Sequence, residues 1–303
     1  MRKTSDRNYM SKWTTYDYVV GGFFLLVLAI IVYPLYWVII ASFSDPALVD
    51  AGKMWFLPKG FTLDGYKEIF TFSSLWIGYR NSLMYTVLGT AINLAVTITA
   101  GYVLSRKDLV GRSFLMVLFI IPMYFNGGLI PTYLQINSLG INNTIWAMVL
   151  PTALSVFNMI IARTYFQSNI PDELLECATL DGCGNFRFFF SIVLPLSTAI
   201  LGVLTVYYAA GHWNGYFQAL IYIRNKNLAP LQIILREILV LNSLNNESFT
   251  LMLMTNTGKL QRHQLAQLIK YGSIIVASVP LLILYPFMQR YFVKGVLIGS
   301  IKG

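Results

Sequence analysis

The chain has 303 residues, of which 56% are hydrophobic and 12% carry a charge. A soluble domain usually has about 25% charged residues, so this chain has too little polar surface to stay in water as a compact globule. The composition, with a mean hydropathy of +0.61, therefore excludes soluble enzymes, disordered chains and collagen-like fibres, and it predicts a membrane protein.

Long segments without Asp, Glu, Lys or Arg mark the predicted membrane crossings. A helix needs about 20 apolar residues to cross a hydrocarbon layer ~30 Å thick, and the longest uncharged stretch, 113–162, has room for two crossings. The apolar runs are continuous rather than alternating, which favours helices over a barrel. The predicted crossings are six helices near 19–41, 84–104, 113–134, 144–162, 191–210 and 271–290.

The basic residues predict which side of the membrane each loop occupies. Twelve lie on the side of the two termini and ten on the other side, a difference too small to decide by itself. The ten fall in two long segments, however, and long segments count little in the positive-inside rule. The short loop after the second crossing carries Arg106, Lys107 and Arg112. We therefore expect a multi-pass protein of the cell membrane with both termini in the cytoplasm.

The crossings also divide the chain into parts with different expected roles. The membrane core spans 81–290 and contains the longest cytoplasmic loop, 163–190. Before the core, residues 1–18 form a cytoplasmic segment, and residues 19–80 contain the first crossing and an extracytoplasmic segment. After the core, residues 291–303 form a cytoplasmic tail.

The predicted membrane core lacks the side chains that would power transport by themselves. Ion-driven pumps usually carry ionisable residues inside their helices, and here the only candidate, His212, is better explained as a hydrogen-bonded structural residue. The sequence has no phosphate-binding loop, metal-ligand spacing or catalytic triad order, which argues against a membrane enzyme. The net charge of +9 comes without a dense basic patch, so nucleic-acid binding is not expected. If the protein does transport work, we therefore expect the energy to enter through another subunit.

The long cytoplasmic loop contains the signals of a short helix. Ser168 or Asn169 can cap its start, and Pro171 suits its first turn. Gly182 or Gly184 can end it, because glycine adopts the left-handed conformation that often follows a helix. The loop is therefore predicted to hold one helix between two membrane helices.

This predicted helix is a candidate docking element for a separate protein. The segment 168–183 has four acids and no base, opposite in sign to the whole chain. One helical face, with small residues in its middle, would let a partner approach the backbone closely. That face holds Leu174, Cys177, Ala178 and Asp181. The same pattern fits a solvated amphipathic loop helix, and the residues alone do not decide between the two.

The loop resembles the EAA motif of the membrane subunits of ABC importers. The matching residues are Glu176-Cys177-Ala178, Asp181-Gly182, Phe186 and Ile192-Val193-Leu194-Pro195, with Cys177 in place of the usual second alanine. The end of the chain is similar to that of the second membrane subunit of maltose-type sugar importers. That likeness covers 289–296 and 299–303, and Pro34, Asn81-Ser82 and Trp213-Asn214 look like the same subfamily.

The resemblance implies an all-α membrane protein with six transmembrane helices in the type I ABC importer permease fold. It implies a transport subunit with no enzymatic activity of its own, which forms half of a pathway across the lipid bilayer with a second permease subunit. Two copies of an ATP-binding subunit would bind ATP and magnesium, and an extracytoplasmic solute-binding protein would deliver an oligosaccharide. The implied ATPase-coupling contacts are Glu173, Glu176, Cys177, Ala178, Asp181 and Gly182, with Gly295, Gly299 and Lys302 of the tail.

Aromatic and polar side chains gather near the end of the fifth predicted helix, where they could contact sugar. The candidates for a substrate path are Tyr208, Trp213, Asn214 and Tyr216, although an interfacial aromatic belt would look the same. The segment 224–270 holds six bases and two acids, which would favour acidic oligosaccharides by raising their local concentration, or would contact the binding protein. A permease for another solute, such as a polyol, glycerol phosphate or an amino acid, is the alternative.

Overall fold

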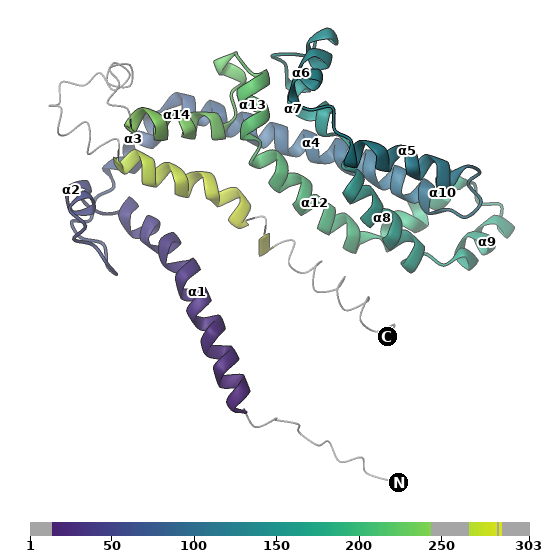
Figure 1. Cartoon of the computed structure of the whole chain (residues 1–303), viewed down its shortest axis with the longest axis horizontal. Helices are drawn as coiled ribbons and strands as arrows, with labels where there is room; N and C mark the ends of the chain where they lie inside the picture. The colour runs from purple at the N-terminus through teal and green to yellow at the C-terminus, as the bar shows by residue number, and fades with distance from the viewer. Residues whose placement is uncertain (1–13, 244–266, 284, 287–303) are drawn as a thin grey trace. The chain divides into compact units, whose positions relative to one another are not determined.

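The computed structural model describes residues 14–243, 267–283 and 285–286, which form helices joined by turns (Figure 1). The chain divides into two compact units. Residues 1–69 with 250–275 form the first unit, and residues 70–249 with 276–303 form the second.

The first unit contains α1 (Thr15–Ser42), which includes the predicted crossing 19–41. The carboxylate of Asp17 caps its start by accepting hydrogen bonds from the N–H and the hydroxyl of Thr14, at 2.7 and 2.8 Å. Most of the side chains of α1 are apolar and exposed within this chain, as expected for a helix surrounded by lipid or by a partner. The unit also holds α2 (Pro46–Asp50) and most of α3 (Asp64–Thr71).

The second unit is organised around α4 (Ser73–Ser105), the longest helix among the described residues. α4 packs against α8, α12 and α14, and Figure 1 shows α8 and α12 running beside it. These partners span Val156–Asn169, Thr198–Trp213 and Leu231–Ser243. Between α12 and α14 lie α13 (Tyr216–Tyr222) and a 3-10 turn (Lys226–Leu228).

A small residue lets α4 and α8 approach each other closely. A Cβ atom built on Gly101 would lie 2.8 Å from the Cβ of Ala162 and 3.2 Å from the backbone nitrogen of Arg163. Any larger side chain would therefore push the two backbones apart. Small residues at contacts are typical of membrane helix pairs, whose association depends on close packing rather than on the hydrophobic effect.

Replacing Gly101 with leucine is expected to destabilise the second unit by about 1–3 kcal/mol, the usual cost of overpacking a close-packed core. The measurement is the thermal unfolding midpoint of the purified protein in detergent. Gly22→Leu is the matched control, because Gly22 lies in α1 with open space around its Cβ position. An unchanged midpoint for Gly101→Leu, or an equal fall for both variants, would contradict this packing.

Three of the predicted crossings are bent. α5 (Arg112–Tyr124) and α6 (Leu129–Ser138) meet at a bend of 113°, residues 145–152 and α8 at a bend of 50°, and residues 185–196 and α12 at a bend of 79°. The prediction of continuous helices is wrong here for 113–134, 144–162 and 191–210. The short elements are α7 (Ile145–Val149), a 3-10 turn (Leu150–Thr152), α10 (Asn185–Phe188), a π-helical turn (Phe189–Val193) and α11 (Leu194–Leu196).

Local chemistry explains two of these bends. Gly128 has φ +86° and ψ −178°, a conformation that is essentially restricted to glycine, and its N–H donates to Oδ1 of Asn126 at 2.9 Å. Pro195 lacks the N–H needed to continue the helix. Next to it, the hydroxyl of Ser197 donates to the carbonyl of Val193 at 2.7 Å, so a carbonyl at this bend keeps a partner.

The apolar segments follow the predicted order, and the described residues agree with an all-α fold class. Two described helices, α1 and α4, are each long and apolar enough to cross a membrane, and the number rises to as many as five if each bent pair is one crossing. A further apolar helix, Gln267–Ile283, overlaps the predicted crossing 271–290, which ends outside the described residues. The count of six crossings therefore stays a prediction.

Candidate functional site

The predicted loop helix is present as α9 (Asp172–Leu180), which Figure 1 shows at one end of the second unit. Pro171 stands at its N-cap, and two carboxylates occupy its first turn, where the helix dipole favours negative charge. The predicted caps Ser168 and Asn169 lie instead in the last turn of α8. The start of α9 was therefore placed a few residues too early.

Gly182 ends α9 as predicted. Its φ of +74° is left-handed, and its N–H donates to the carbonyl of Thr179 at 3.0 Å. The N–H of Cys183 donates to the carbonyl of Ala178 at 2.8 Å. This pair of bonds is the Schellman arrangement, which satisfies the last carbonyls of a helix and turns the chain sharply.

Most of the predicted coupling residues are exposed on α9 and its end. The exposed ones are Glu173, Glu176, Cys177, Asp181 and Gly182. Ala178 differs, because it is only 7% exposed and belongs to a buried apolar cluster that includes Phe166 and Phe188. The predicted face is therefore divided, since Ala178 anchors α9 to its own subunit while Leu174, Cys177 and Asp181 are exposed.

The start of α9 is tied to the loop that follows α4. Nζ of Lys107 lies 2.5 Å from Oδ2 of Asp172, and this hydrogen bond raises the pKa of the lysine ammonium. Both side chains are largely exposed, so the pair contributes little to stability. A pocket of about 390 Å³ lies beside it, and its lining includes Arg106, Arg112 and Glu173. Charges of both signs thus surround the start of α9.

Two of the predicted substrate-path residues are buried and hydrogen-bonded within the chain. The hydroxyl of Tyr208 lies 2.6 Å from Oγ1 of Thr97. Nε1 of Trp213 donates to the carbonyl of Ala277 at 3.1 Å, and its ring makes a T-shaped contact with the ring of Tyr79. Contacts within this chain therefore occupy both rings, which the structure places in the interior.

The other two substrate-path residues lie nearer the surface. Asn214 is exposed, and Tyr216 is half-buried with the guanidinium of Arg236 5.9 Å from its ring centre. A contact with sugar stays a prediction for these two residues. The predicted tail contacts Gly295, Gly299 and Lys302 lie outside the described residues.

His212 is a hydrogen-bonded structural residue, as its position predicted. Its Nε2 lies 2.6 Å from Oδ1 of Asn93, which is fully buried in α4. The amide nitrogen of Asn93 donates to the carbonyl of Thr152, just after Pro151 interrupts the helix. Asn93 was missed among the important residues, although an amide inside an uncharged apolar stretch is itself a signal.

The comparison with known families and relatives agrees with this architecture. The family model described as the binding-protein-dependent transport system inner membrane component matches residues 93–298. The Bacillus subtilis polygalacturonan/rhamnogalacturonan transport system permease protein YtcP is 39% identical over 288 residues, which cover 95% of this chain and 98% of the relative. Protein LplC of the same organism is 40% identical over 276 residues, which cover 91% of this chain and 90% of the relative.

A solved structure matches the fold. It is a chain of a bacterial ABC transporter involved in the import of the acidic polysaccharide alginate, with a TM-score of 0.82 and 28% identity. The match covers 93% of this chain and all of that chain. This chain therefore belongs to the family of binding-protein-dependent transport system inner membrane components, as a membrane subunit of the carbohydrate ABC importer type.

Proposed function

We propose that this chain is a permease subunit of an ATP-driven importer for oligosaccharides, with acidic oligosaccharides among its substrates. The observation that carries the proposal is the 39% identity to a permease of a polygalacturonan/rhamnogalacturonan transport system, over 95% of this chain. The alginate importer, with its TM-score of 0.82, supports the acidic class. Alginate and polygalacturonan both carry carboxylates on their sugar units, so both relatives are associated with anionic sugars.

In this proposal, α9 couples the permease to an ATP-binding subunit. Its exposed acids offer a charged surface, while Ala178 holds the helix firmly on its own subunit. Two copies of the ATP-binding subunit hold ATP and magnesium and hydrolyse the nucleotide, and their closure moves the membrane helices. The ATP-binding subunit must contact the two conformations of the permease differently. A partner that binds both conformations equally well cannot shift the equilibrium between them.

The other parts of the importer complete the pathway. A second permease subunit forms the other half of the channel, and an extracytoplasmic solute-binding protein delivers the oligosaccharide. Both termini of this chain lie in the cytoplasm, which agrees with the basic residues of the short loop after α4. The same loop contacts α9 through Lys107, as expected if α9 meets the ATP-binding subunit on that side.

An importer for a polyol, glycerol phosphate or an amino acid is the alternative proposal. It would use the same coupling helix, so the architecture of the site does not distinguish it. The relatives reported above favour carbohydrate instead.

A comparison of two sugars tests the acidic class. The basic segment 224–270 includes Arg224, Lys226 and Arg236 among the described residues of the second unit, and a positive surface can raise the association rate of an anion by about tenfold or more at low salt. We therefore expect faster uptake of trigalacturonate than of neutral maltotriose. The preference should shrink with added salt, because the screening length falls from about 30 Å at 0.01 M to about 3 Å at 1 M. Failure to take up trigalacturonate would refute acidic oligosaccharides as substrates, and equal uptake of the two sugars at every salt concentration would refute the role of the basic residues.

A further inference from the structure

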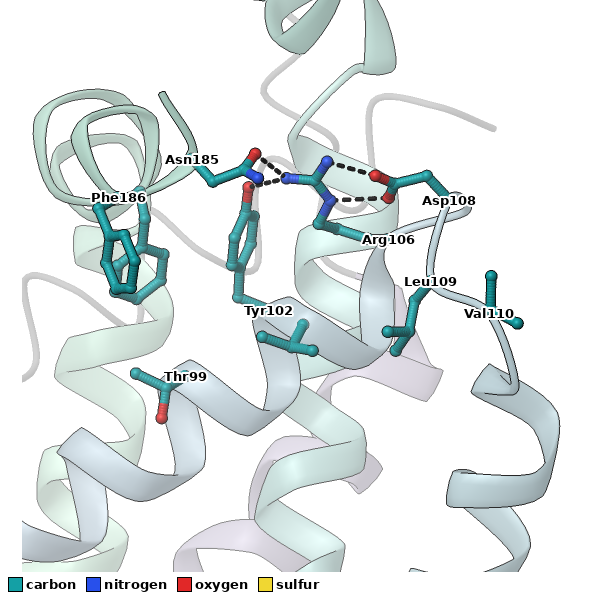
Figure 2. A pocket seen from close by; sticks show the side chains of 10 residues that line it. Thr99, Tyr102, Arg106, Asp108, Leu109, Val110, Asn185 and Phe186 are labelled. Atoms are coloured by element: carbon teal, nitrogen blue, oxygen red, sulfur yellow. Dashed lines mark hydrogen bonds and ion pairs between the residues drawn. The ribbon is translucent and has the colours of Figure 1, made fainter. Parts of the chain in front are cut away.

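Arg106 directly follows α4 and contacts the segment that follows α9. Its Nη1 donates to Oδ1 of Asn185 at 2.8 Å and to the hydroxyl of Tyr102 at 3.4 Å. Its Nε and Nη2 donate to the two carboxylate oxygens of Asp108, at 2.7 and 2.5 Å. Figure 2 shows the guanidinium between Asn185 on one side and Asp108 on the other. The side chain is thus held in one orientation by partners on both sides.

The segment before α9 is held at the same end of α4. Nε of Arg163, in α8, donates to the carbonyl of Leu104 at 3.1 Å. α9 therefore lies between two segments, and each of them is hydrogen-bonded to the last residues of α4 or to Arg106 just beyond. These bonds join the segments on either side of α9 to the end of α4.

Apolar packing between α4 and the segment after α9 is incomplete at this end. A pocket of about 620 Å³ opens here, and its lining includes Val103 of α4 and Phe186 of α10. Tyr102 and Phe189 make a ring contact with centroids 5.0 Å apart. The hydrogen bond from the guanidinium to Asn185 therefore adds a polar connection beside the apolar contacts that join these two segments.

The surroundings of Arg106 differ from those of the neighbouring ion pair. The side chain of Arg106 is 18% exposed, whereas those of Lys107 and Asp172 are 78% and 53% exposed. The bond from Arg106 lowers the pKa of Asp108, so this carboxylate stays ionised and keeps the guanidinium oriented. Exposed ion pairs contribute little to stability, so the pair of Lys107 and Asp172 is expected to be the weaker of the two connections.

We propose that Arg106 is a positioning residue which, through Asn185, transmits displacement of α9 to α4. The inference rests on the proposed function, because it assumes that an ATP-binding subunit moves α9. Since α4 is the helix against which α8, α12 and α14 pack, moving its end shifts the whole second unit. Arg106 thereby links nucleotide-driven motion to the transport pathway.

The test uses the whole importer, purified through a tag on this chain and placed in liposomes. Uptake of whichever trisaccharide the wild type transports is divided by the ATP hydrolysed. Arg106→Lys keeps the positive charge, and with it the loop's topology signal, but it loses the planar fork needed to reach both partners. Asn185→Ala removes the acceptor. Coupling between two sites is typically worth 5–150-fold, so we expect uptake per ATP to fall about fivefold or more in each variant.

Controls separate this role from general damage. Asn185→Asp keeps an acceptor for the guanidinium and should retain coupling. The double variant of Arg106→Lys and Asn185→Ala should be no worse than either single variant, because both remove the same interaction. Unchanged uptake per ATP in Arg106→Lys and Asn185→Ala would overturn the inference.

A cross-link distinguishes failure of the inference from failure of the proposed function. Cys177 is an exposed thiol on α9, and a thiol-to-amine reagent can join it to a neighbouring subunit, with Cys177→Ala as the blank. We expect the wild type, Arg106→Lys and Asn185→Ala all to cross-link to the ATP-binding subunit. A retained cross-link with unchanged uptake per ATP refutes the role of Arg106 alone. An importer whose wild-type chain gives no such cross-link refutes the docking role of α9 and the inference with it.

Discussion

Replacing Gly182 with tryptophan is expected to abolish uptake while the chain still folds and inserts. Its φ of +74° is left-handed, which costs other residues about 1–2 kcal/mol, and the bonds that close α9 depend on this turn. No atom lies within 4 Å of the position of a Cβ on Gly182, so the new ring finds room within this chain. It would project from the surface that we propose the ATP-binding subunit covers. Three quantities are measured: sugar uptake by cells, the amount of this chain found in membranes, and the amount of ATP-binding subunit that copurifies with it.

Gly52→Trp is the matched control for this experiment. Gly52 has φ +63° and equally open surroundings, but it lies in the first unit, far from α9 in the sequence. It carries the same backbone strain and the same added bulk without touching the proposed docking surface. Normal transport by Gly182→Trp, or equal losses in both variants, would defeat the assignment of α9 as the coupling helix.

A second large effect is expected from replacing Asn93 with leucine, which should lower the stability of the second unit. Leucine fills a similar space but leaves the carbonyl of Thr152 and Nε2 of His212 without the partner that each has now. A buried polar group without a partner costs about 1–3 kcal/mol, and two groups are affected here. The thermal unfolding midpoint of the importer in detergent should fall, together with its yield in membranes.

Thr99→Val serves as the control for Asn93→Leu. Thr99 also lies in α4, but it is exposed, and its hydroxyl donates to the carbonyls of Ala95 and Val96 in its own helix, at 2.6 and 3.1 Å. Removing this hydroxyl therefore breaks hydrogen bonds within α4 only and leaves no polar group of another helix without its partner. A midpoint for Asn93→Leu equal to that of Thr99→Val would show that the buried amide does not hold the interrupted helix in place.

The positions of the apolar segments could be predicted because charge is excluded from lipid, and that signal is summed over some 20 residues. The bends could not be predicted this way. Residues 126–128 and Pro195 act over one turn, inside stretches that remain apolar on both sides of the interruption. A window long enough to detect a crossing averages over such a turn.

The candidate site, like the membrane helices, could be predicted from the sequence only in part. The end of α9 followed from Gly182, because a left-handed turn has a strong local preference for glycine. The burial of Ala178 did not follow, because nothing in its helical spacing says which neighbour covers it. Arg106 stood out only as one of three bases in a short loop, and the role that we propose for it depends on Asn185, 79 positions further along the chain.

The length of α4 has a consequence for the choice of membrane. Arg80 and Arg106 bracket its uncharged part and lie about 39 Å apart along a helix that rises 1.5 Å per residue. A hydrophobic stretch longer than the local hydrocarbon thickness is accommodated by tilting, and the angle depends on that thickness. Since three other helices pack on α4, we expect liposomes made from short-chain and long-chain lipids to hold the second unit at different inclinations.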